Sequence, residues 1–489
     1  MKTIYFIAAL SLFLVSGCSD VEDNYSTTPN HQLSFSTDTL TFDTVFTTVG
    51  SATKQFMVYN RNKKALNIES IVLANKGNSA FKINVDGRIG TDFSDIEILP
   101  KDSIYIFVEV TIDPHDSNTP FEVKDEVEFI YNGNKQSVLL QAFGQDTYII
   151  QGGLRIEKDT ILNGKRPFLV YDSICIEPGV TVNIEAGARF YLHNKAHIEV
   201  YGTVIAQGTL EKPIVFRGDR MDDLLPGRLA YDDTPGLWDG ITFHTESYNN
   251  RFEQVIVRNG RTGLRFLPST PEQLKIVFLS SQITNMSGNL LYAENCHIEA
   301  ANTEFTNAQD SLIALSGGKY HFVHCTIANF MQIKSRSGAP SVVLQHNSPV
   351  SGREPYPIES IFFKNCIIDG SWSQSSGEIV VEGEKTFDFR FTHCLLRQKG
   401  DLENTENCLF ISGLNNNRYR MNGKAEENYK FDFRLKSDES GYPEAIGGAD
   451  ITIARLYPID RYGTTRVSND ILPDIGAYQY VPELEKKEE

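Results

Sequence analysis

The stretch ICIEPGVTVNIEAGARFYLHNKAHIEVYGTVIAQGTLEKPIVFRG, from Ile174 to Gly218, decides the fold of most of this chain. Its apolar residues stand in pairs and triplets, and glycine recurs at positions 179, 187, 202 and 208. Glycine adopts the positive φ angles of tight corners without strain. Strands of three to five residues between such corners are too short for a sandwich and need stacked neighbours for stability. The pattern therefore predicts a series of stacked β-coils.

A repeat of the same kind continues towards the C-terminus. The motifs VIVRN, SQITN, TEFTN, CTIAN, CIIDG and CLLRQ align on the apolar residues Val257, Ile283, Phe305, Ile327, Ile368 and Leu396, in steps of 26, 22, 22, 41 and 28 residues. One coil takes roughly 20 to 30 residues, so the longest step holds either one coil with a long loop or two short coils. The proline-rich segment from Arg336 to Pro357 is where we expect that loop.

These repeats resemble a known fold family. The segment WDGITF, Trp238 to Phe243, and the glycine-spaced stretch are similar to the first coils of pectin-lyase-like right-handed parallel β-helices. The resemblance covers residues 152–480 and implies a β-helix domain at 148–480, followed by a charged tail at 481–489. Its motifs specify a fold and not a substrate.

The C-terminal part resembles the ending of bacterial surface β-helix proteins. In those proteins a DYRL-like strand, a PAI-like turn and a DIGA-like strand close the helix. The corresponding stretches here run from Asp432 to Asp450 and from Pro458 to Tyr480, and DIGAY at Asp474 to Tyr478 fits well. An insertion before Pro443 departs from the pattern.

The residues before the coils alternate between apolar and polar in short runs. Seven such runs, LSFSTDTLTFDTVF, KQFMVYNR, LNIESIVL, FKINV, IYIFVEVTI, DEVEFIYN and SVLLQAFG, are separated by Gly, Asn, Asp and Pro clusters. Seven short strands over about 110 residues favour an immunoglobulin-like β-sandwich. We place this domain at 33–147. The whole fold class is thus all-β, a sandwich followed by a parallel β-helix.

The N-terminus has the features of an export signal. Lys2 supplies a positive charge, Ile4 to Val15 is an apolar run too short for a permanent membrane-spanning helix, and Val-Ser-Gly-Cys ends it. This ending resembles a bacterial lipobox, which implies a cleaved signal peptide at 1–17 and lipidation of Cys18. The acidic start of the tether 18–32 resembles the export tag of Bacteroidetes surface lipoproteins, with a plain solvated tether as the alternative. The resemblance implies the cell outer membrane, contacted only through the lipid.

Period-two geometry assigns the faces of the coils. If the aligned apolar residue points inwards, so does the residue two positions earlier: Val255, Ser281, Thr303, Cys325, Cys366 and Cys394. These cysteines are expected to fill a narrow core, because no CxxC pair indicates a metal site. Two positions after the apolar residue stand Asn259, Asn285, Asn307, Asn329 and Gly370, residue types that tolerate left-handed corners.

Outward positions supply the candidate glycan-binding residues. Three positions before the apolar residue lie Gln254, Ser280, Asn302, His324, Asn365 and His393, whose amides and imidazoles could bind successive sugars. With Trp238 they form the candidate glycan-binding set, and a solvated sheet face is the alternative. One position before the apolar residue the set is mixed and includes Gln282 and Glu304.

The loop from Arg217 to Leu237 supplies the candidate catalytic acids. It carries the carboxylates Asp222, Asp223, Asp232 and Asp233, and the nearest basic cluster contains Arg258 and Arg261. Paired carboxylates can hold Ca²⁺ or act as acid and base on a glycosidic bond, whereas a polysaccharide lyase needs a basic residue. An ordinary charged loop is the alternative. The GHG motif of polyuronide hydrolases is missing from the sequence.

Charge restricts the partners. The 489 residues include 63 acidic and 46 basic ones, for a formal net charge of −17, so the surface repels nucleic acid and anionic headgroups. Three hypotheses follow. The first is a non-catalytic surface platform that binds a glycan or another extracellular macromolecule. The second is a carbohydrate-active enzyme, a polysaccharide lyase, and the third is a purely structural or adhesive protein. The oligomeric state stays open.

Overall fold

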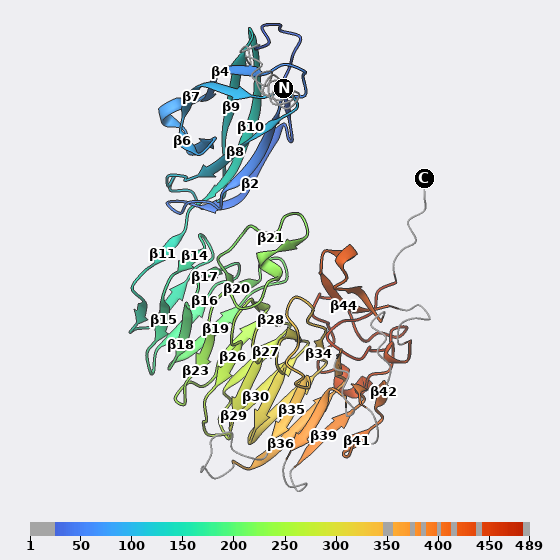
Figure 1. Cartoon of the computed structure of the whole chain (residues 1–489). Coiled ribbons are helices and arrows are strands. Elements are labelled where there is room, and N and C mark those ends of the chain that lie inside the picture. The colour runs from blue at the N-terminus through green and yellow to red at the C-terminus, as the bar shows by residue number, and fades with distance from the viewer. Residues whose placement is uncertain are drawn as a thin grey trace, which may run out of the picture. The chain divides into compact units, whose positions relative to one another are not determined.

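The computed structural model describes residues 25–345, 356–371, 377–382, 388–398, 402–411, 418–436 and 443–482. They fall into two compact units, one ending at Asp146 and the other beginning at Thr147 (Figure 1). Cys18, the predicted signal peptide and residues 483–489 of the predicted tail lie outside the described residues. Within the described ranges, no helix has the length and apolarity needed to cross a membrane.

The first unit is a sandwich of two five-stranded sheets. One sheet contains, in spatial order, β1 (Ser34–Phe35), β3 (Lys54–Tyr59), β8 (Ser103–Val110), β5 (Phe81–Val85) and β6 (Arg88–Gly90). The other contains β2 (Thr39–Phe46), β10 (Asn134–Gln145), β9 (Phe121–Tyr131), β4 (Leu66–Leu73) and β7 (Asp92–Ile98), and a short 3₁₀ turn, η1 (Lys76–Asn78), follows β4. Alternate residues such as Phe56, Ile106 and Phe129 are buried between the sheets.

The sandwich differs in detail from the seven predicted strands. The first predicted strand is two strands, β1 and β2, which belong to opposite sheets. β6 and β7 were not predicted, because their sequence is polar and interrupted by glycine and aspartate. β2 also pairs in parallel with β10, whereas the remaining sandwich pairs are antiparallel.

The second unit is a parallel β-helix whose three sheets we call A, B and C. Sheet A contains β11 (Tyr148–Ile150), β14 (Phe168–Val170), β17 (Arg189–Leu192), β20 (Ile214–Gly218), β25 (Val255–Arg258), β28 (Gln282–Met286), β31 (Glu304–Ala308), β34 (Thr326–Asn329), β37 (Ile367–Gly370), β40 (Leu395–Arg397) and β42 (Leu409–Ile411). Sheet B contains β12 (Leu154–Ile156), β15 (Ser173–Ile176), β18 (His197–Val200), β23 (Gly240–Phe243), β26 (Leu264–Phe266), β29 (Leu291–Glu294), β32 (Ile313–Ser316), β35 (Val342–Gln345) and β38 (Ile379–Glu382). Sheet C contains β13 (Thr160–Leu162), β16 (Thr181–Ile184), β19 (Thr203–Gln207), β24 (Asn250–Glu253), β27 (Ile276–Leu279), β30 (His297–Ala301), β33 (Gly318–Val323), β36 (Ile358–Lys364), β39 (Phe389–Thr392) and β41 (Thr405–Glu406).

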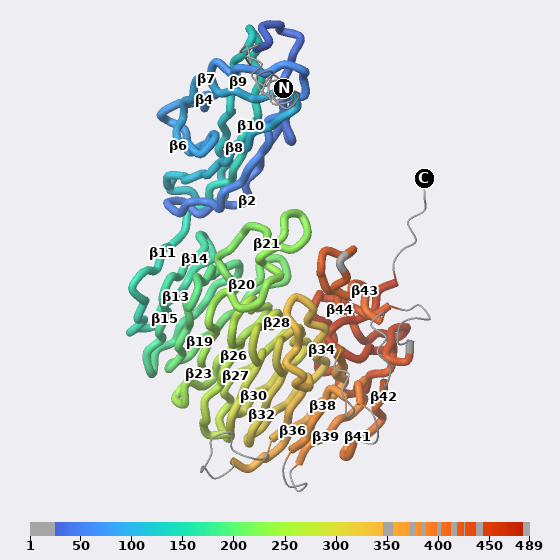
Figure 2. Tube along the Cα trace, in the orientation of Figure 1, coloured from blue at the N-terminus to red at the C-terminus, as the bar shows by residue number. Residues whose placement is uncertain are grey.

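Each coil passes through sheets B, C and A in turn, and the coils stack along one axis, as the gradual colour change of the trace shows (Figure 2). The register confirms the sequence alignment, because each aligned apolar residue from Val257 to Leu396 pairs with the next one. The 41-residue step is a single coil, since Ile327 pairs directly with Ile368. The predicted loop from Arg336 to Pro357 is wrong in part, because β35 lies within it; residues 346–355 lie outside the described residues.

The interior ladder is confirmed. The six predicted inward residues from Val255 to Cys394 are fully buried. Along this ladder the backbone N–H of Cys325 donates to Sγ of Cys366, and that of Cys366 to Sγ of Cys394, each at 3.4 Å. All six described cysteines are free thiols; Cys296, Cys325, Cys366 and Cys394 are buried core side chains, whereas Cys175 and Cys408 are partly exposed.

The asparagine corners are confirmed for three coils. Asn259, Asn285 and Asn307 have φ angles of 70°, 62° and 56°. The prediction is wrong for Asn329 and Gly370, which end strands without a positive φ.

Two further segments pack against the coils. The first, inserted between β20 and β23, contains the hairpin β21 (Asp223–Leu225) and β22 (Leu229–Ala230) and the turn η2 (Tyr231–Asp233). The second is the C-terminal part, where the antiparallel hairpin β43 (Tyr419–Asn422) and β44 (Phe431–Leu435) encloses η3 (Ala425–Glu427). It is followed by residues 443–482, which we call the C-terminal strap, with η4 (Pro443–Ala445) and α2 (Ile451–Ala454).

The predicted closing elements take a different form. The DFRL stretch is a strand, β44, but it pairs with β43 and adds no parallel coil. The DIGAY stretch is not a strand. Its backbone lies against the sides of coils, where Gly476 N donates to Asn365 O at 2.8 Å and Ala477 N to Thr326 Oγ1 at 3.0 Å.

Candidate binding groove

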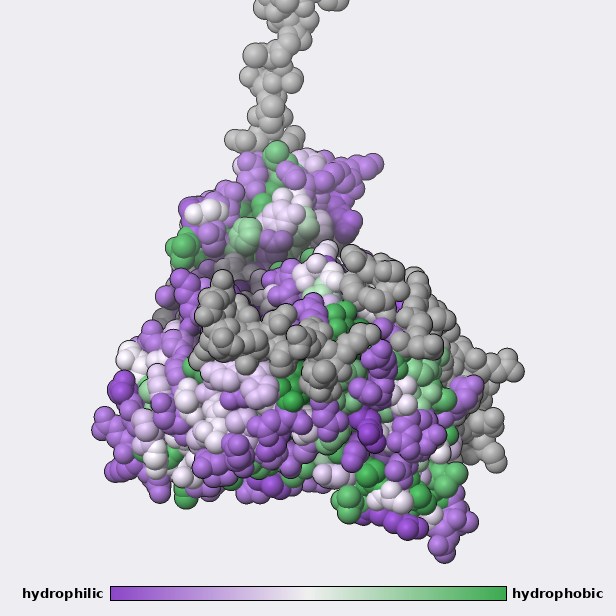
Figure 3. All heavy atoms as spheres, turned by 90° about the horizontal axis from the view of Figure 1, so that it is seen from below, coloured by the Kyte–Doolittle hydropathy of each residue, from purple (hydrophilic) through white to green (hydrophobic). Residues whose placement is uncertain are grey.

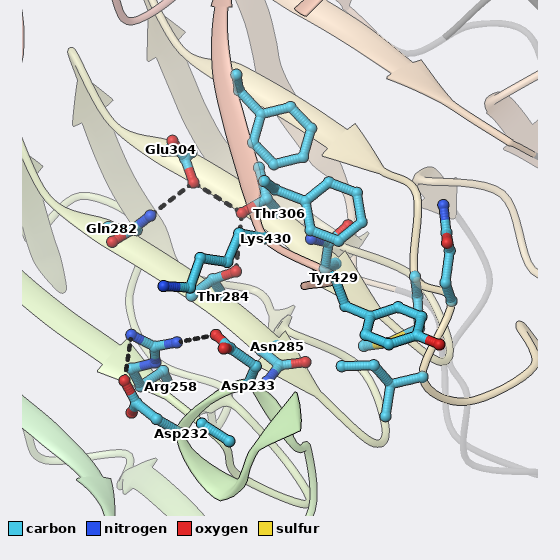
Figure 4. Close-up of a pocket in the computed structure, with 17 residues that line it drawn as sticks. Asp232, Asp233, Arg258, Gln282, Thr284, Asn285, Glu304, Thr306, Tyr429 and Lys430 are labelled. Carbon is cyan, nitrogen blue, oxygen red and sulfur yellow. Dashed lines mark hydrogen bonds and ion pairs between the residues drawn. The ribbon is translucent and has the colours of Figure 1, made fainter. Parts of the chain in front are cut away.

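A groove of about 390 Å³ runs over the outer face of sheet A (Figure 4). Its floor comes from β25, β28 and β31, one wall from η2, and the other from the hairpin β43–β44 with the residues before β44. The lining residues are Ala230, Asp232, Asp233, Arg258, Gln282, Thr284, Asn285, Glu304, Thr306, Asn307, Met331, Gln332, Ile333, Tyr429, Lys430, Phe431 and Phe433. The groove therefore combines a polar floor with an aromatic wall.

An ion-pair cluster forms one side of the groove. Arg258 Nη1 lies 3.1 Å from Asp232 Oδ2, and its Nη2 lies 2.9 Å from Asp233 Oδ1. Arg217 Nη1 contacts the other oxygen of Asp232 at 3.0 Å. Burial raises the pKa of Asp233, and the Arg258 guanidinium acts against that rise. Both carboxylates are thus paired with guanidinium groups. They do not offer the free oxygen ligands that Ca²⁺ takes.

The floor is a hydrogen-bonded network on neighbouring coils. Gln282 Nε2 and Thr306 Oγ1 each donate to Glu304 Oε1 at 2.8 Å, and Thr306 Oγ1 also contacts Thr284 Oγ1 at 2.9 Å. Glu304 is only 3% exposed, and the Tyr478 hydroxyl of the strap donates to its other oxygen. The Glu304 carboxylate is therefore held from both sides.

Two nitrogen-bearing side chains at the groove, those of Asn285 and Lys430, are the candidates for contact with a ligand. Asn285 Nδ2 is buried and has no hydrogen-bond partner among the described residues, although it lines the groove. Lys430 is exposed and faces the groove from the opposite wall, next to Tyr429 (Figure 4). Phe431 and Phe433 stack in the same wall, with ring centroids 5.5 Å apart. An unsatisfied buried amide costs free energy unless a ligand or water bonds to it.

The structure brings together only part of the predicted catalytic set. Asp232, Asp233 and Arg258 meet in the groove, but Asp222 pairs with Arg220 and Asp223 accepts from Gly227 N. Arg261 lies in the turn after β25, where it bonds to Asp239 and Asn194. The charges of Asp222 and Arg261 are thus each matched by an adjacent group.

The predicted glycan-binding column lies in a row of turns, which we call the turn column, and not on a sheet face, and the prediction is wrong for its buried members Asn302, His324 and Asn365. Gln254, Asn302, His324, Asn365 and His393 are the single corner residues between sheets C and A, with φ angles between 48° and 55°. Asn302, His324 and Asn365 are buried beside the strap, whereas Gln254 and His393 are partly exposed. Their amides bond to strap atoms, as when Asn302 Nδ2 donates to Ile459 O at 2.8 Å and Gln254 Nε2 to Arg461 O at 3.1 Å.

The prediction that Trp238 contributes to the glycan-binding surface is also wrong. It is fully buried, and its indole N–H donates to Arg258 O at 2.8 Å. A large aromatic ring in that position packs the core of the coil and offers no face to a sugar.

Most groove residues were missed from the sequence. Gln282 and Glu304 stood in the mixed outward set, one position before the aligned apolar residue, while Thr284 and Thr306 stood one position after it. A search of both flanking positions for hydroxyl and amide side chains would have found the floor. Tyr429 and Lys430 come from a distant hairpin, for which the coil period gives no signal.

Comparisons with known proteins show no relatives by sequence: no family description matches the chain, and no curated protein does. Solved structures match only in part. A Vibrio cholerae VesB protease is 15% identical with a TM-score of 0.17, covering 24% of this chain and 33% of its own. A family 123 glycoside hydrolase from Clostridium perfringens is 8% identical with a TM-score of 0.16, covering 23% of this chain and 26% of its own. A PapD-like domain of human CEP192 is 10% identical with a TM-score of 0.17, covering 27% of this chain and 94% of its own. This chain thus spans about a third of the protease, and likenesses this weak identify no function.

Proposed function

We propose that the groove on sheet A binds a glycan chain without cleaving it. The observation that supports this most is the unpartnered Asn285 amide beside hydroxyl and carboxamide groups from neighbouring coils. Coils repeat at about 4.8 Å, so such groups can meet successive hydroxyls of an extended saccharide. The aromatic wall adds apolar surface for a sugar ring.

Binding without cleavage is favoured by the state of the carboxylates. A glycoside hydrolase needs two carboxyl groups free to exchange protons or to attack. Here Asp232 and Asp233 are paired with Arg217 and Arg258, and Glu304 is held by three neighbours.

The proposal extends to location. The lipobox-like ending at Cys18 and its acidic sequel support an outer-membrane, surface-exposed lipoprotein, with the sandwich as a spacer. Labelling of intact cells with an antibody, compared with permeabilised cells, would test the exposure. Cys18→Ala should release the protein from the membrane fraction.

A glycan panel tests the binding. The lipid-free chain from residue 19 onwards is screened with and without Ca²⁺, and hits are titrated. We expect saturable, calcium-independent binding that Asn285→Gly weakens, since glycine keeps the positive φ but removes the amide. Asp222→Ala, a change at a partly exposed ion pair outside the groove, is the control and should bind normally. Absence of binding across the panel would overturn the proposal and favour a purely structural role.

A polysaccharide lyase is the second candidate, because the exposed Lys430 faces Arg258 and the paired aspartates across the groove. A lyase needs a basic residue that takes up a proton from the sugar ring, and a lysine amine can fill that role. New ultraviolet absorbance from unsaturated products would support the lyase, and loss of that signal in Lys430→Ala would assign the base. Binding without new absorbance supports the non-catalytic groove.

A further inference from the structure

A second cluster of chemically active side chains lies on sheet C, away from the groove. His297 and Glu299 are two positions apart on β30, and His321 is on the neighbouring strand β33, directly opposite Glu299 in the register. Alternate residues of a strand share a face, and Ile298, Ala300 and Tyr320 fill the interior. All three polar side chains therefore point outwards from two adjacent coils.

The ligand atoms are close enough for one ion. One atom from each side chain lies within 4.8 Å of the others. His297 Nε2 lies 3.3 Å from Glu299 Oε1, and His321 Nδ1 lies 4.0 Å from the same oxygen. Ligands bound tetrahedrally at about 2.0 to 2.2 Å are roughly 3.3 to 3.6 Å apart, so one pair already fits and the other needs a small rotation.

The neighbouring side chains orient the His321 imidazole. His321 Nε2 lies 3.3 Å from Ser360 Oγ, and its ring stacks on Phe362, which leaves Nδ1 facing Glu299. A hydrogen bond on the distal nitrogen is the usual support of a metal-binding histidine. His297 Nδ1 is buried without a hydrogen-bond partner among the described residues.

Two lysines near the cluster are themselves engaged. Lys319 pairs with Glu359 at 2.8 Å, and Lys364 Nζ lies over the Phe362 ring, 5.6 Å from its centroid. Their charges oppose a cation but do not occupy the ligand atoms. A cavity of about 290 Å³ adjoins Glu299 and His321 and reaches Tyr457 of the strap.

We propose that His297, Glu299 and His321 form a binding site for Zn²⁺ or a similar transition-metal ion. Two imidazoles and one carboxylate suit Zn²⁺ and disfavour Ca²⁺, which takes oxygen ligands. Three protein ligands leave a fourth position open to water on the side of the cavity. The site is independent of the groove on sheet A.

Calorimetric titration of the metal-free, lipid-free chain with ZnCl₂ tests the proposal. We expect one equivalent of Zn²⁺ to bind and no response to CaCl₂. His297→Ala and His321→Ala each remove a ligand, so they should weaken Zn²⁺ binding by more than the roughly 10- to 100-fold that loss of a supporting hydrogen bond costs. Ser360→Ala should lose about 10-fold. His244→Ala is the matched control, because His244 pairs with Glu199 on sheet B without a third ligand within the described residues.

Co²⁺ absorption supplies an independent measurement. Visible bands without a thiolate charge-transfer band support the His–Glu–His site, whereas a thiolate band would assign the metal to cysteine and overturn it. Should a histidine variant unfold, Glu299→Gln decides, because this side chain is 45% exposed and its replacement leaves the core intact. Stoichiometric Zn²⁺ binding that survives Glu299→Gln, or no binding by the parent chain, contradicts the proposal.

Discussion

Two polar columns follow the coils of this β-helix, and they end in opposite environments. The middle of the turn column, from Asn302 to Asn365, is buried beside the C-terminal strap, and the amides of Gln254, Asn302 and Asn365 bond to strap backbone atoms. The sheet A column, from Arg258 through Thr284 to Thr306, faces a groove in which the Asn285 amide lacks a partner. Polar residues at the coil period can thus serve either folding or binding, and the covering segment decides which.

The surface between such features is unremarkable in composition. The face of the β-helix unit seen from below is mostly hydrophilic, with apolar residues in small separate patches (Figure 3). This is the pattern expected for strands that bury alternate residues.

The largest expected effect concerns the groove wall formed by the hairpin β43–β44. Asp369 of β37 is fully buried, where it pairs with Arg418 and accepts from the Tyr419 hydroxyl at 2.8 Å. Asp369→Ala leaves the buried Arg418 charge without its carboxylate and should lower the free energy of unfolding by about 3 to 5 kcal/mol. Urea denaturation measures it. A loss below about 1 kcal/mol, as expected for the partly exposed pair in Asp222→Ala, would show that the wall is not anchored there.

The second prediction breaks the turn column. Asn365 bonds to Asp450 through both ends of its amide, at 2.8 and 3.1 Å, while its φ is 55°. Asn365→Ala loses these bonds and strains the corner, so the protein should be less stable by about 2 to 3 kcal/mol. Asn365→Gly should recover about 1 kcal/mol, because glycine relieves the strain alone. Equal stability of the two variants would contradict the role of the positive φ.

The third prediction concerns pH. Burial, with a smaller contribution from Arg466, holds the pKa of His324 well below its usual 6.5. The unfolded chain then binds a proton that the folded chain does not, so stability should fall as pH drops below about 6.5, by up to about 1.4 kcal/mol per pH unit. Thermal melts between pH 5 and 7 should show a shallower slope for His324→Gln. An unchanged slope would show that His324 is protonated in the fold.

The smallest effect on stability is expected in the sheet A groove. Asn285→Gly removes an amide that has no protein partner and should change the free energy of unfolding by less than about 1 kcal/mol. A larger loss in urea denaturation would mean that this amide supports the fold, as the turn-column amides do.

Much of the fold could be predicted from the sequence because coil stacking repeats a local pattern. The register of Val257, Ile283 and their successors, and the inward cysteines, follow from period two within a strand and a nearly constant coil length. The predictions that were wrong concern residues whose surroundings are set by segments distant in the sequence. The burial of His324 requires knowledge of where the strap packs, and the strand β35 was hidden in a proline-rich step.

The candidate site could be predicted only in part, for the same reason. Asp232 and Asp233 lie in the insertion just before the strand that carries Arg258, so the sequence could predict that these three side chains come together. Trp238 looked like a sugar platform, but its ring completes the core of its coil. Lys430 reaches the groove from a hairpin more than a hundred residues after β31 in the sequence. No local sequence pattern predicts that contact.

Calorimetric titration of the best glycan from the panel into paired variants tests the central claim most directly. The open groove predicts that Asn285→Gly weakens binding about 5- to 10-fold, the worth of one hydrogen bond, while Asn365→Gly under the strap leaves the Kd unchanged. The reverse pattern, with affinity lost in Asn365→Gly and kept in Asn285→Gly, would contradict the account.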